Sequence, residues 1–254
     1  MTAPRWLDGR QIAHRGLHDA ANGIIENTPA AVAAAIAAGY AIEVDLQLSR
    51  DGEAMVFHDV TLERLTLASG RLSDRTAAQL ATARFRGAPD ARIVTLDSLL
   101  RQVDGQVPLV LEIKGGWKHV GPLESRIAGC LQDYAGTAAV MSFDPRSVGW
   151  FRTHAPGIRR GLVAGAFANG DTWPGLTRFQ RFRLRHLLSA FTVRPEFIAF
   201  DVKALPTLAT RLARLYGLPV LVWTVRSDDD RKRAERYGDV MIFEHIRPGT
   251  RHDG

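Results

Sequence analysis

The chain has 254 residues, a mass of 28.0 kDa and 46% hydrophobic residues, enough for one large α/β domain with a sizeable core. Its 24% charged residues lie near the globular average and exclude a globally disordered chain. The net charge of +6 fits anionic partners such as phosphate esters, phospholipid surfaces or nucleic acid. Only four lysines are present, so the basic excess is arginine. Because no nucleic-acid-binding motif accompanies it, we expect no nucleic-acid partner.

The sequence also indicates the cellular compartment in which the protein is expected. Cys130 is the only cysteine, so no internal disulfide can form. The first ten residues lack the apolar stretch of a secretory signal, and no uninterrupted apolar run could span a bilayer. We therefore expect a soluble, cytoplasmic protein.

Short apolar runs of β type alternate along the chain with helical stretches. The runs show no polar–apolar alternation, which suits strands buried on both faces, as in parallel sheets. The predicted strands are Gln11–Gly16, Ala41–Ser49, Ala54–Asp59, Leu109–Lys114, Ala138–Asp144, Arg160–Ala164, Phe197–Val202, Val220–Val225 and Val240–Glu244. The predicted helices are Pro29–Ala38, Leu96–Val103, Pro122–Tyr134, Pro145–His154, Thr177–Ala190, Pro206–Tyr216 and Asp228–Tyr237.

Local signals support the first helix. Thr28 and Pro29 predict an N-cap followed by proline in the first helical position, and Gly39 predicts the end of the helix. Repeated strand–helix units of this length are typical of a (β/α)8 TIM barrel or of a doubly wound sheet. No Gly-x-Gly-x-x-Gly follows a strand, which weakens the dinucleotide-binding form of the doubly wound sheet.

Nine strands are one too many for a plain barrel, and an early hairpin accounts for the extra one. Only residues 50–53 separate the second predicted strand from the third, whereas a parallel crossover needs a dozen residues or more. Asp51-Gly52 predicts the turn. Pairing Ser49 with Ala54 would place Asp45 opposite His58. We therefore expect local geometry to bring this histidine to the carboxylates of the second strand.

The segment 60–94 is mostly polar and rich in turn residues. We interpret it as a small insertion over the barrel mouth, within a single catalytic domain of residues 1–254. No internal repeat or linker is present in the sequence.

Ionisable residues interrupt the apolar strands where they would be costly to bury, which favours a functional site. Hard oxygen ligands suit Ca²⁺ or Mg²⁺, and two imidazoles can move protons near neutral pH. Carboxylates, imidazoles and basic side chains together indicate phosphodiester chemistry. Cleavage of a phosphodiester requires removal of a proton from the attacking oxygen and donation of a proton to the leaving alkoxide. Metal and basic side chains can stabilise the phosphoryl charge. The residues concerned are His14, Arg15, Glu43, Asp45, His58, Glu112 and Lys114.

A set of short motifs follows in order from Gln11 to Pro248, over nearly the whole chain. They are His14-Arg15-Gly16, Glu26-Asn27-Thr28, Glu43-Val44-Asp45, Asp51-Gly52, His58-Asp59, Leu111-Glu112-Ile113-Lys114, Ser142-Phe143-Asp144 and Trp223-Thr224-Val225. Single triplets are weak signals, but the ordered set in the expected strand contexts is specific. It resembles the glycerophosphodiester phosphodiesterase family.

This resemblance implies a TIM barrel and a metal-dependent hydrolysis of glycerophosphodiesters to sn-glycerol 3-phosphate and an alcohol, within glycerol and lipid metabolism. The substrate's own 2-hydroxyl would attack phosphorus, giving a cyclic phosphate that water opens. By resemblance, one divalent metal (Ca²⁺ or Mg²⁺) is held by Glu43, Asp45 and Glu112. His14 and His58 form the acid–base pair, and Arg15 and Lys114 contact the phosphate. The resemblance also implies that Glu26 is a further ligand in the metal shell or of the substrate, and that Asn27 orients its neighbours. The position of Trp223 on a predicted barrel strand end separately indicates a wall of the substrate pocket.

One departure from the family pattern lies near the C-terminus. Phe243-Glu244-His245-Ile246-Arg247-Pro248 stands where the family often has Thr-Asp before a proline. The departure leaves the role of the last strand end open and does not affect the motifs that carry the resemblance.

Thr177–Leu188 is a basic, amphipathic helix candidate with Phe179, Phe182 and Leu187 roughly on one face. Such helices can lie on anionic membranes. We favour instead an outer barrel helix that packs its apolar face inward.

Two alternative functions stay open. The first is a lipid-acting phosphodiesterase of the lysophospholipase D or sphingomyelinase D type at a membrane surface. The second, less favoured, is a non-catalytic phosphate-binding module.

Overall fold

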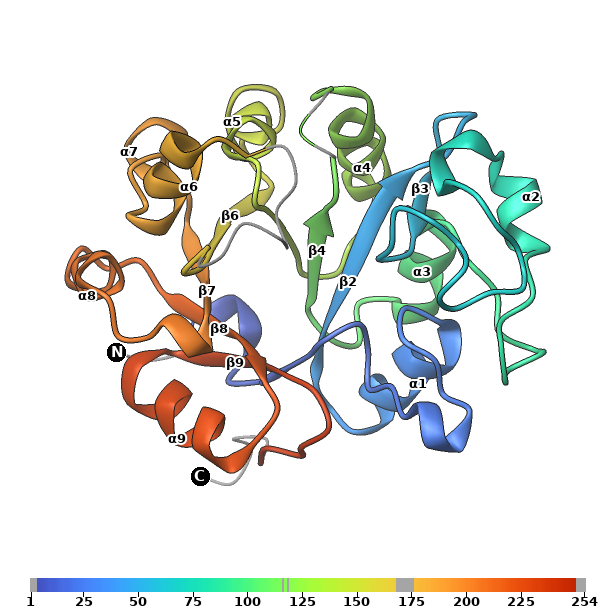
Figure 1. Cartoon of the computed structure of the whole chain (residues 1–254), viewed down its shortest axis with the longest axis horizontal. Coiled ribbons are helices and arrows are strands. Elements are labelled where there is room, and N and C mark those ends of the chain that lie inside the picture. Colours follow the sequence, from blue (N-terminus) through green and yellow to red (C-terminus); the bar gives the residue numbers. More distant parts are fainter. Residues whose placement is uncertain (1–3, 116, 118, 168–175, 250–254) are drawn as a thin grey trace. The chain divides into compact units, whose positions relative to one another are not determined.

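The computed structural model describes residues 4–115, 117, 119–167 and 176–249, and the chain divides into two compact units. The first unit contains Met1–Ile12 and Ala139–Gly254, and the second contains Ala13–Ala138. In each unit strands and helices follow one another along the chain (Figure 1). The short strand β1 (Ile12–Ala13) spans the boundary between the two units.

The second unit is built around β2 (Ala41–Leu48), which pairs in parallel with β4 (Leu109–Ile113) and antiparallel with β3 (Ala54–Val56). Its remaining helices and 3-10 turns are η2 (Ala20–Asn22), α1 (Pro29–Ala37), η3 (Leu72–Asp74), α2 (Ala77–Ala81), α3 (Leu96–Val103) and α4 (Pro122–Gln132). Every residue of β4 is buried, and so is every residue of β2 except the last. This burial explains the absence of a polar–apolar alternation in their sequences.

The first helix begins and ends as its sequence predicts. The Thr28 side chain accepts a hydrogen bond from the backbone N–H of Ala31, and Pro29 occupies the first turn. Gly39 follows the helix with a φ of 72°, the left-handed conformation that glycine adopts without strain.

The β2–β3 hairpin is present, but its predicted register is wrong by one residue. Leu48 pairs with Ala54, and the Phe57 N–H donates to the Asp45 carbonyl, so Asp45 lies opposite Phe57 and not His58. The turn explains the shift. Gly52 has a φ of 87°, and Ser49 N–H donates to the Glu53 carbonyl, so three residues form the loop where four were predicted.

The segment 60–94 contains η3 and the short helix α2, which the sequence did not predict. The Thr76 side chain and Gln79 form a capping box at the start of α2. Apolar residues of the segment pack with residues of β3 and its flank in one buried cluster: Ile25, Met55, Phe57, Leu62, Leu72, Leu80, Ala83, Phe85, Ala88 and Ile93. The segment thus shares its hydrophobic core with the hairpin.

In the first unit five strands lie side by side in the order β5-β6-β7-β8-β9. Their bounds are β5 (Ala138–Ser142), β6 (Arg159–Ala164), β7 (Phe197–Asp201), β8 (Val220–Val225) and β9 (Val240–Phe243), and all neighbouring pairs are parallel. Their helices and 3-10 turns are η1 (Arg5–Leu7), α5 (Pro145–His154), α6 (Arg178–Arg185), α7 (Ala190–Val193), η5 (Val202–Ala204), α8 (Leu208–Leu215) and α9 (Asp228–Tyr237).

All nine predicted strands are present, and the two that precede the histidines end early, at Ala13 and Val56. The helix predicted over Thr177–Ala190 is shorter, because α6 ends at Arg185 and Leu187 takes a φ of 56°. Phe179 and Phe182 are exposed and only Leu187 is buried, so the predicted inward packing of this apolar face is wrong for both phenylalanines. Within the described ranges no helix is both long and apolar enough to cross a bilayer.

Candidate active site

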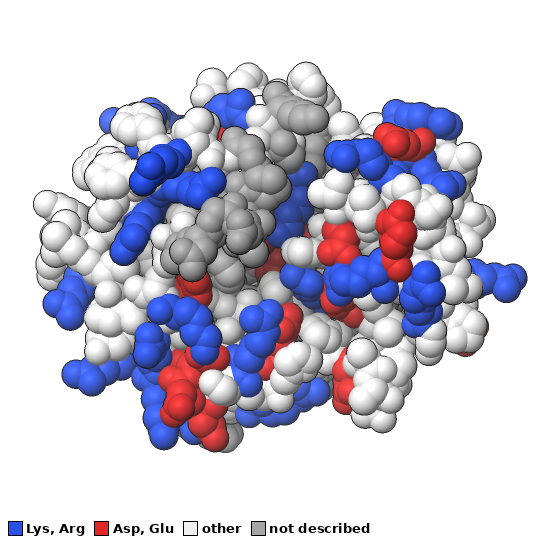
Figure 2. Space-filling model, in the orientation of Figure 1, with Lys and Arg blue, Asp and Glu red and all other residues white. Residues whose placement is uncertain are grey.

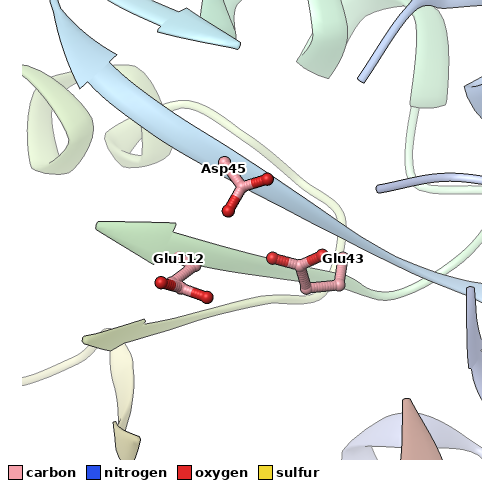
Figure 3. Close-up of side chains that lie close together, drawn as sticks. All are labelled: Glu43, Asp45 and Glu112. Atoms are coloured by element: carbon pink, nitrogen blue, oxygen red, sulfur yellow. The ribbon is translucent and has the colours of Figure 1, made fainter. Parts of the chain in front are cut away.

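Three carboxylates from two neighbouring strands of the second unit point toward one another (Figure 3). Glu43 and Asp45 come from the same face of β2, and Glu112 comes from β4, where it lies beside Asp45 in the parallel ladder. One oxygen from each carboxylate lies within 4.8 Å of the others, and all three residues are buried. Three buried negative charges at this separation repel one another, so the site requires positive charge.

The protein supplies part of that charge through Lys114. Its Nζ lies 3.0 Å from Asp45 Oδ1 and also pairs with Glu112 Oε1. Burial opposes the charge on Lys114, but the carboxylates prevail and raise its pKa above the ordinary value. Burial likewise raises the pKa of Asp45, and Lys114 together with both histidines and Arg15 overcomes that effect and lowers it strongly. Asp45 is thus held ionised within reach of four cationic or protonatable groups.

Glu43 is the carboxylate whose negative charge is least balanced by neighbouring positive groups. Burial raises its pKa well above the ordinary value, and the neighbouring Asp45 and Glu112 carboxylates raise it further. Its Oε2 accepts the Arg15 backbone N–H at 2.9 Å, whereas Oε1 is buried without a hydrogen-bond partner among the described residues. A buried oxygen left without a donor is costly, and an all-oxygen donor set suits a hard divalent cation. The residues present therefore fit a bound metal ion.

His58 lies just beyond the end of β3, where hydrogen bonds fix both its ring and the backbone on either side of it. Its Nδ1 lies 2.7 Å from Asp59 Oδ1. The Gln47 amide donates to the carbonyls of Phe57 and Asp59, at 2.9 and 2.7 Å, on either side of the histidine. Burial raises the pKa of Asp59, but hydrogen bonds from His58 and Arg64 lower it to about 2. An ionised carboxylate only accepts hydrogen bonds, so Nδ1 carries a proton and Nε2 is the nitrogen that can exchange one.

His14 and Arg15 follow β1 directly and face the same carboxylates. His14 Nε2 lies 3.7 Å from Glu43 Oε2, and Arg15 Nε lies 3.3 Å from Asp45 Oδ2. Arg15 and Gly16 have φ values of 55° and 77°. A Cβ on Gly16 would lie 2.8 Å from atoms of Ala31, so only glycine permits this close approach of the loop to α1.

Two residues of the predicted Glu26-Asn27-Thr28 motif reach the site by different contacts. The Asn27 amide donates to Asp45 Oδ2 at 2.8 Å, and its carbonyl oxygen accepts the Asp45 N–H at 3.2 Å. Glu26 accepts from Arg15 at 2.7 Å and from Arg64 at 2.7 and 3.0 Å. Glu26 thus lies between two arginines and pairs with both. Asn27, which has a φ of 57°, fixes the orientation of Asp45.

Sequence reasoning missed Gln47 and Arg64. Gln47 was detectable, because it continues the face of β2 that carries Glu43 and Asp45 at a period of two residues. Nothing in the sequence distinguished Arg64 from the other arginines of segment 60–94. Its contacts with Asp59 and Glu26 depend on how that segment folds.

Trp223, predicted for the substrate pocket, lies on β8 of the first unit. Its ring meets that of Phe143 edge to face, with centroids 5.5 Å apart, and its Nε1 is buried without a hydrogen-bond partner among the described residues. Gly165 approaches the same ring, since a Cβ there would lie 3.7 Å from Trp223. The contacts of Trp223 within this unit do not assign it a role in the reaction.

A cavity of about 420 Å³ borders Lys114 in the second unit. Arg50, Arg71 and His119 also line it, with Gln47 and Ser73 among the polar residues. Small-molecule sites have volumes of this order. The face of Figure 2 shows basic side chains interspersed with acidic ones, not gathered into a single stripe.

Comparisons with known proteins agree with this geometry. Residues 14–245 match the model of the glycerophosphoryl diester phosphodiesterase family. A glycerophosphodiester phosphodiesterase of Caldanaerobacter subterraneus is 28% identical, over 89% of this chain and 90% of its own length. The YhdW protein of Bacillus subtilis is also 28% identical, over 92% of this chain and 93% of its own length.

A solved structure establishes the fold. An Oleispira antarctica phosphodiesterase, in complex with its product sn-glycerol-3-phosphate, superimposes with a TM-score of 0.76 over 95% of this chain and 93% of its own, at 20% identity. The predicted (β/α)8 TIM barrel is therefore confirmed. The family match covers most of the sequence, including both histidines and all three carboxylates. The chain belongs to the glycerophosphoryl diester phosphodiesterase family and is an enzyme of that class.

Proposed function

We propose that this enzyme hydrolyses glycerophosphodiesters to sn-glycerol 3-phosphate and an alcohol, with one divalent metal and a pair of histidines. The observation that carries the proposal is the gathering of three buried carboxylates, two imidazoles and two basic side chains around Asp45. The product bound to the Oleispira antarctica relative supports the choice of substrate.

Glu43, Asp45 and Glu112 would hold the metal, either Ca²⁺ or Mg²⁺. The uncompensated Oε1 of Glu43 and the raised pKa of that carboxyl support this assignment, because a cation would relieve both. When bound, the ion supplies charge stabilisation to the phosphoryl oxygens.

His14 and His58 would exchange the two protons of the reaction. One imidazole takes the proton of the attacking hydroxyl, and the other gives a proton to the leaving alkoxide oxygen. Asp59 holds the Nδ1 proton of His58, which leaves Nε2 to face the reacting oxygen. Arg15 and Lys114 would contact the phosphate, since both carry charge at the carboxylate cluster and neither is fully buried.

Product analysis on a panel of water-soluble glycerophosphodiesters tests this proposal. We expect sn-glycerol 3-phosphate and the free alcohol in equal amounts, loss of activity in excess chelator, and recovery with Ca²⁺ or Mg²⁺. His14→Asn and His58→Asn should each be inactive while melting like the wild type. Full activity in chelator would contradict the metal, and release of the phosphorylated alcohol would contradict the assigned bond cleavage.

The lipid-acting alternative is favoured by three exposed phenylalanines, Phe179 and Phe182 on α6 and Phe191 on α7. Glycerophosphocholine should be compared with its lysolipid, with and without detergent. A clear preference for the lysolipid would replace our substrate assignment. Family membership speaks against the non-catalytic phosphate-binding module.

A further inference from the structure

The exposed large hydrophobic side chains of the described residues are concentrated in one part of the chain. Of ten such side chains, eight lie between residues 179 and 216. They are Phe179, Phe182, Leu188, Phe191, Leu208, Leu212, Leu215 and Tyr216. Phe191, Leu215 and Tyr216 are more than four-fifths exposed, at 81%, 82% and 83%. Clusters of exposed apolar side chains, unlike isolated ones, mark interaction surfaces.

The same part of the chain carries the basic excess. Residues 176–216 contain eight lysines or arginines and two acidic residues, so their formal net charge equals the +6 of the entire chain. Glu196 is paired with Arg160, and Asp201 is half-buried and accepts the Lys203 backbone N–H. Between residues 176 and 216, the exposed arginines that have no ion pair within the described ranges are Arg178, Arg185, Arg194 and Arg211. The surface therefore combines apolar and cationic side chains.

Topology places these residues side by side. α6 and α7 connect β6 to β7, and α8 connects β7 to β8. Because these three strands are neighbours in the sheet, the connecting helices occupy neighbouring positions beside it (Figure 1). We call the eight hydrophobic residues and four arginines named above the basic apolar surface.

The apolar side chains of this surface are not misplaced core residues. α6 and α7 are already anchored through Leu184, Leu187 and Val193, which are buried. α8 turns its small residues inward, with Thr210 and Ala213 buried, and presents its leucines outward. The helices thus pack on the unit by one side and expose a second apolar side that the fold does not use.

We propose that the basic apolar surface docks this enzyme on membranes that contain anionic lipid. Amphipathic elements with arginines and exposed Phe and Leu side chains bind at the interface between headgroups and acyl chains. Anionic headgroups complement the arginines. A second copy of the chain would instead bring like charges together, and the apolar gain would be offset by their repulsion. Charge complementarity therefore selects a lipid surface over self-association.

Vesicle co-sedimentation of the full chain tests this docking without reference to catalysis. We expect binding to phosphatidylcholine vesicles that contain phosphatidylglycerol, little binding to pure phosphatidylcholine, and weakening of binding as salt is added. The double variant Arg178→Gln/Arg185→Gln should weaken binding roughly 25-fold, at about fivefold for each arginine removed. Phe179→Ser/Phe191→Ser should weaken it by about tenfold or more.

A matched control is available in the second unit. Leu67 is exposed, and Arg84 is exposed without an ion pair among the described residues, so Leu67→Ser/Arg84→Gln removes the same kinds of group elsewhere. The control should bind vesicles like the wild type. All variants should hydrolyse a water-soluble glycerophosphodiester at the wild-type rate and unfold at the same temperature. Wild-type binding that is absent, equal on both vesicle types, or equally reduced in the control would overturn the proposal. So would a wild-type dimer that the phenylalanine variant dissociates.

Discussion

Two regions differ in opposite ways from the usual burial of side chains. They are the carboxylate cluster of the second unit and the basic apolar surface of the first. The cluster buries Glu43, Asp45 and Glu112, which proteins usually expose. The surface exposes Phe191, Leu215 and similar side chains, which proteins usually bury. In the cluster Asp45 and Glu112 are paired with Lys114, whereas in the surface four arginines have no ion pair within the described ranges. Under the two proposals made above, contact with an outside molecule would account for each departure: a substrate and a cation in one, a lipid headgroup in the other.

The largest expected effect sharpens the chemical side of this comparison. His14→Ala or His58→Ala should lower kcat by about 10²–10⁴-fold, because each would remove one of the two proposed proton-transfer groups. Steady-state kinetics on a glycerophosphodiester measures the loss. The exposed His154, whose Nδ1 contacts the Trp150 carbonyl, provides the control His154→Gln, which should keep wild-type kcat. An active His58→Ala enzyme would remove that histidine from the reaction.

Gly16→Ala tests how tightly the loop beside the cluster is built. The added Cβ meets Ala31 atoms at 2.8 Å and requires a left-handed alanine, so the free energy of unfolding should fall by roughly 2–3 kcal/mol. Gly23→Ala has a similar φ of 75° and nothing within 4 Å, and should cost only about 1 kcal/mol. Urea denaturation of both variants separates the clash from the backbone strain. Equal losses would show that Ala31 yields without cost.

The pH dependence of stability probes the partner of His58. The pKa of Asp59 is lowered by His58 and Arg64 to about 2 in the folded chain, below its ordinary value of 3.8. Its contribution is therefore complete above about pH 4 and is lost as the pH falls toward 2. The free energy of unfolding of the wild type should exceed that of Asp59→Asn by at most about 1 kcal/mol at pH 6, because solvent reaches the carboxylate in part and screens its ion pairs. Chemical denaturation at several pH values gives the difference, and a gap that is undiminished at pH 2 would refute this linkage.

The smallest expected effect concerns the basic apolar surface. Leu215→Lys should change the free energy of unfolding by no more than about 0.5 kcal/mol, since the side chain is 82% exposed. Leu184→Ala, on the buried side of α6, should cost about 2–5 kcal/mol. Thermal and chemical denaturation compares the two. A large loss in Leu215→Lys would mean that this leucine stabilises the fold and is not reserved for a partner.

The sequence predicted the parts of this enzyme that local rules control. Strand positions, the Thr28 cap and the shared face of Glu43 and Asp45 depend on periodicity and capping, and the structure shows all three. The hairpin was predicted with the wrong register, because the four-residue spacing also fits a three-residue loop with a left-handed Gly52. One residue of register changes the cross-strand partner of Asp45, so contacts across the hairpin were beyond that prediction.

Other features depended on long-range packing. The role of Arg64 follows from how segment 60–94 returns to Glu26, a contact between residues 38 positions apart. The exposure of Phe179 and Phe182 also could not be derived from the helical pattern, which gives the relative orientation of side chains but not which side meets the sheet. In both cases the sequence showed which chemical group the residue carries but not which residues surround it in the fold.

Arg64 forms ion pairs with both Glu26 and Asp59. These contacts link the segment 60–94 to the Glu26-Asn27-Thr28 motif and to the His58-Asp59 motif. That segment shares a hydrophobic core with the hairpin but contributes no carboxylate to the cluster. Arg64 is thus the residue through which a segment outside the cluster contacts two residues that border it. For protein engineering, a graft that replaces segment 60–94 would have to supply both the guanidinium group that meets Glu26 and Asp59 and the apolar side chains that pack on the hairpin.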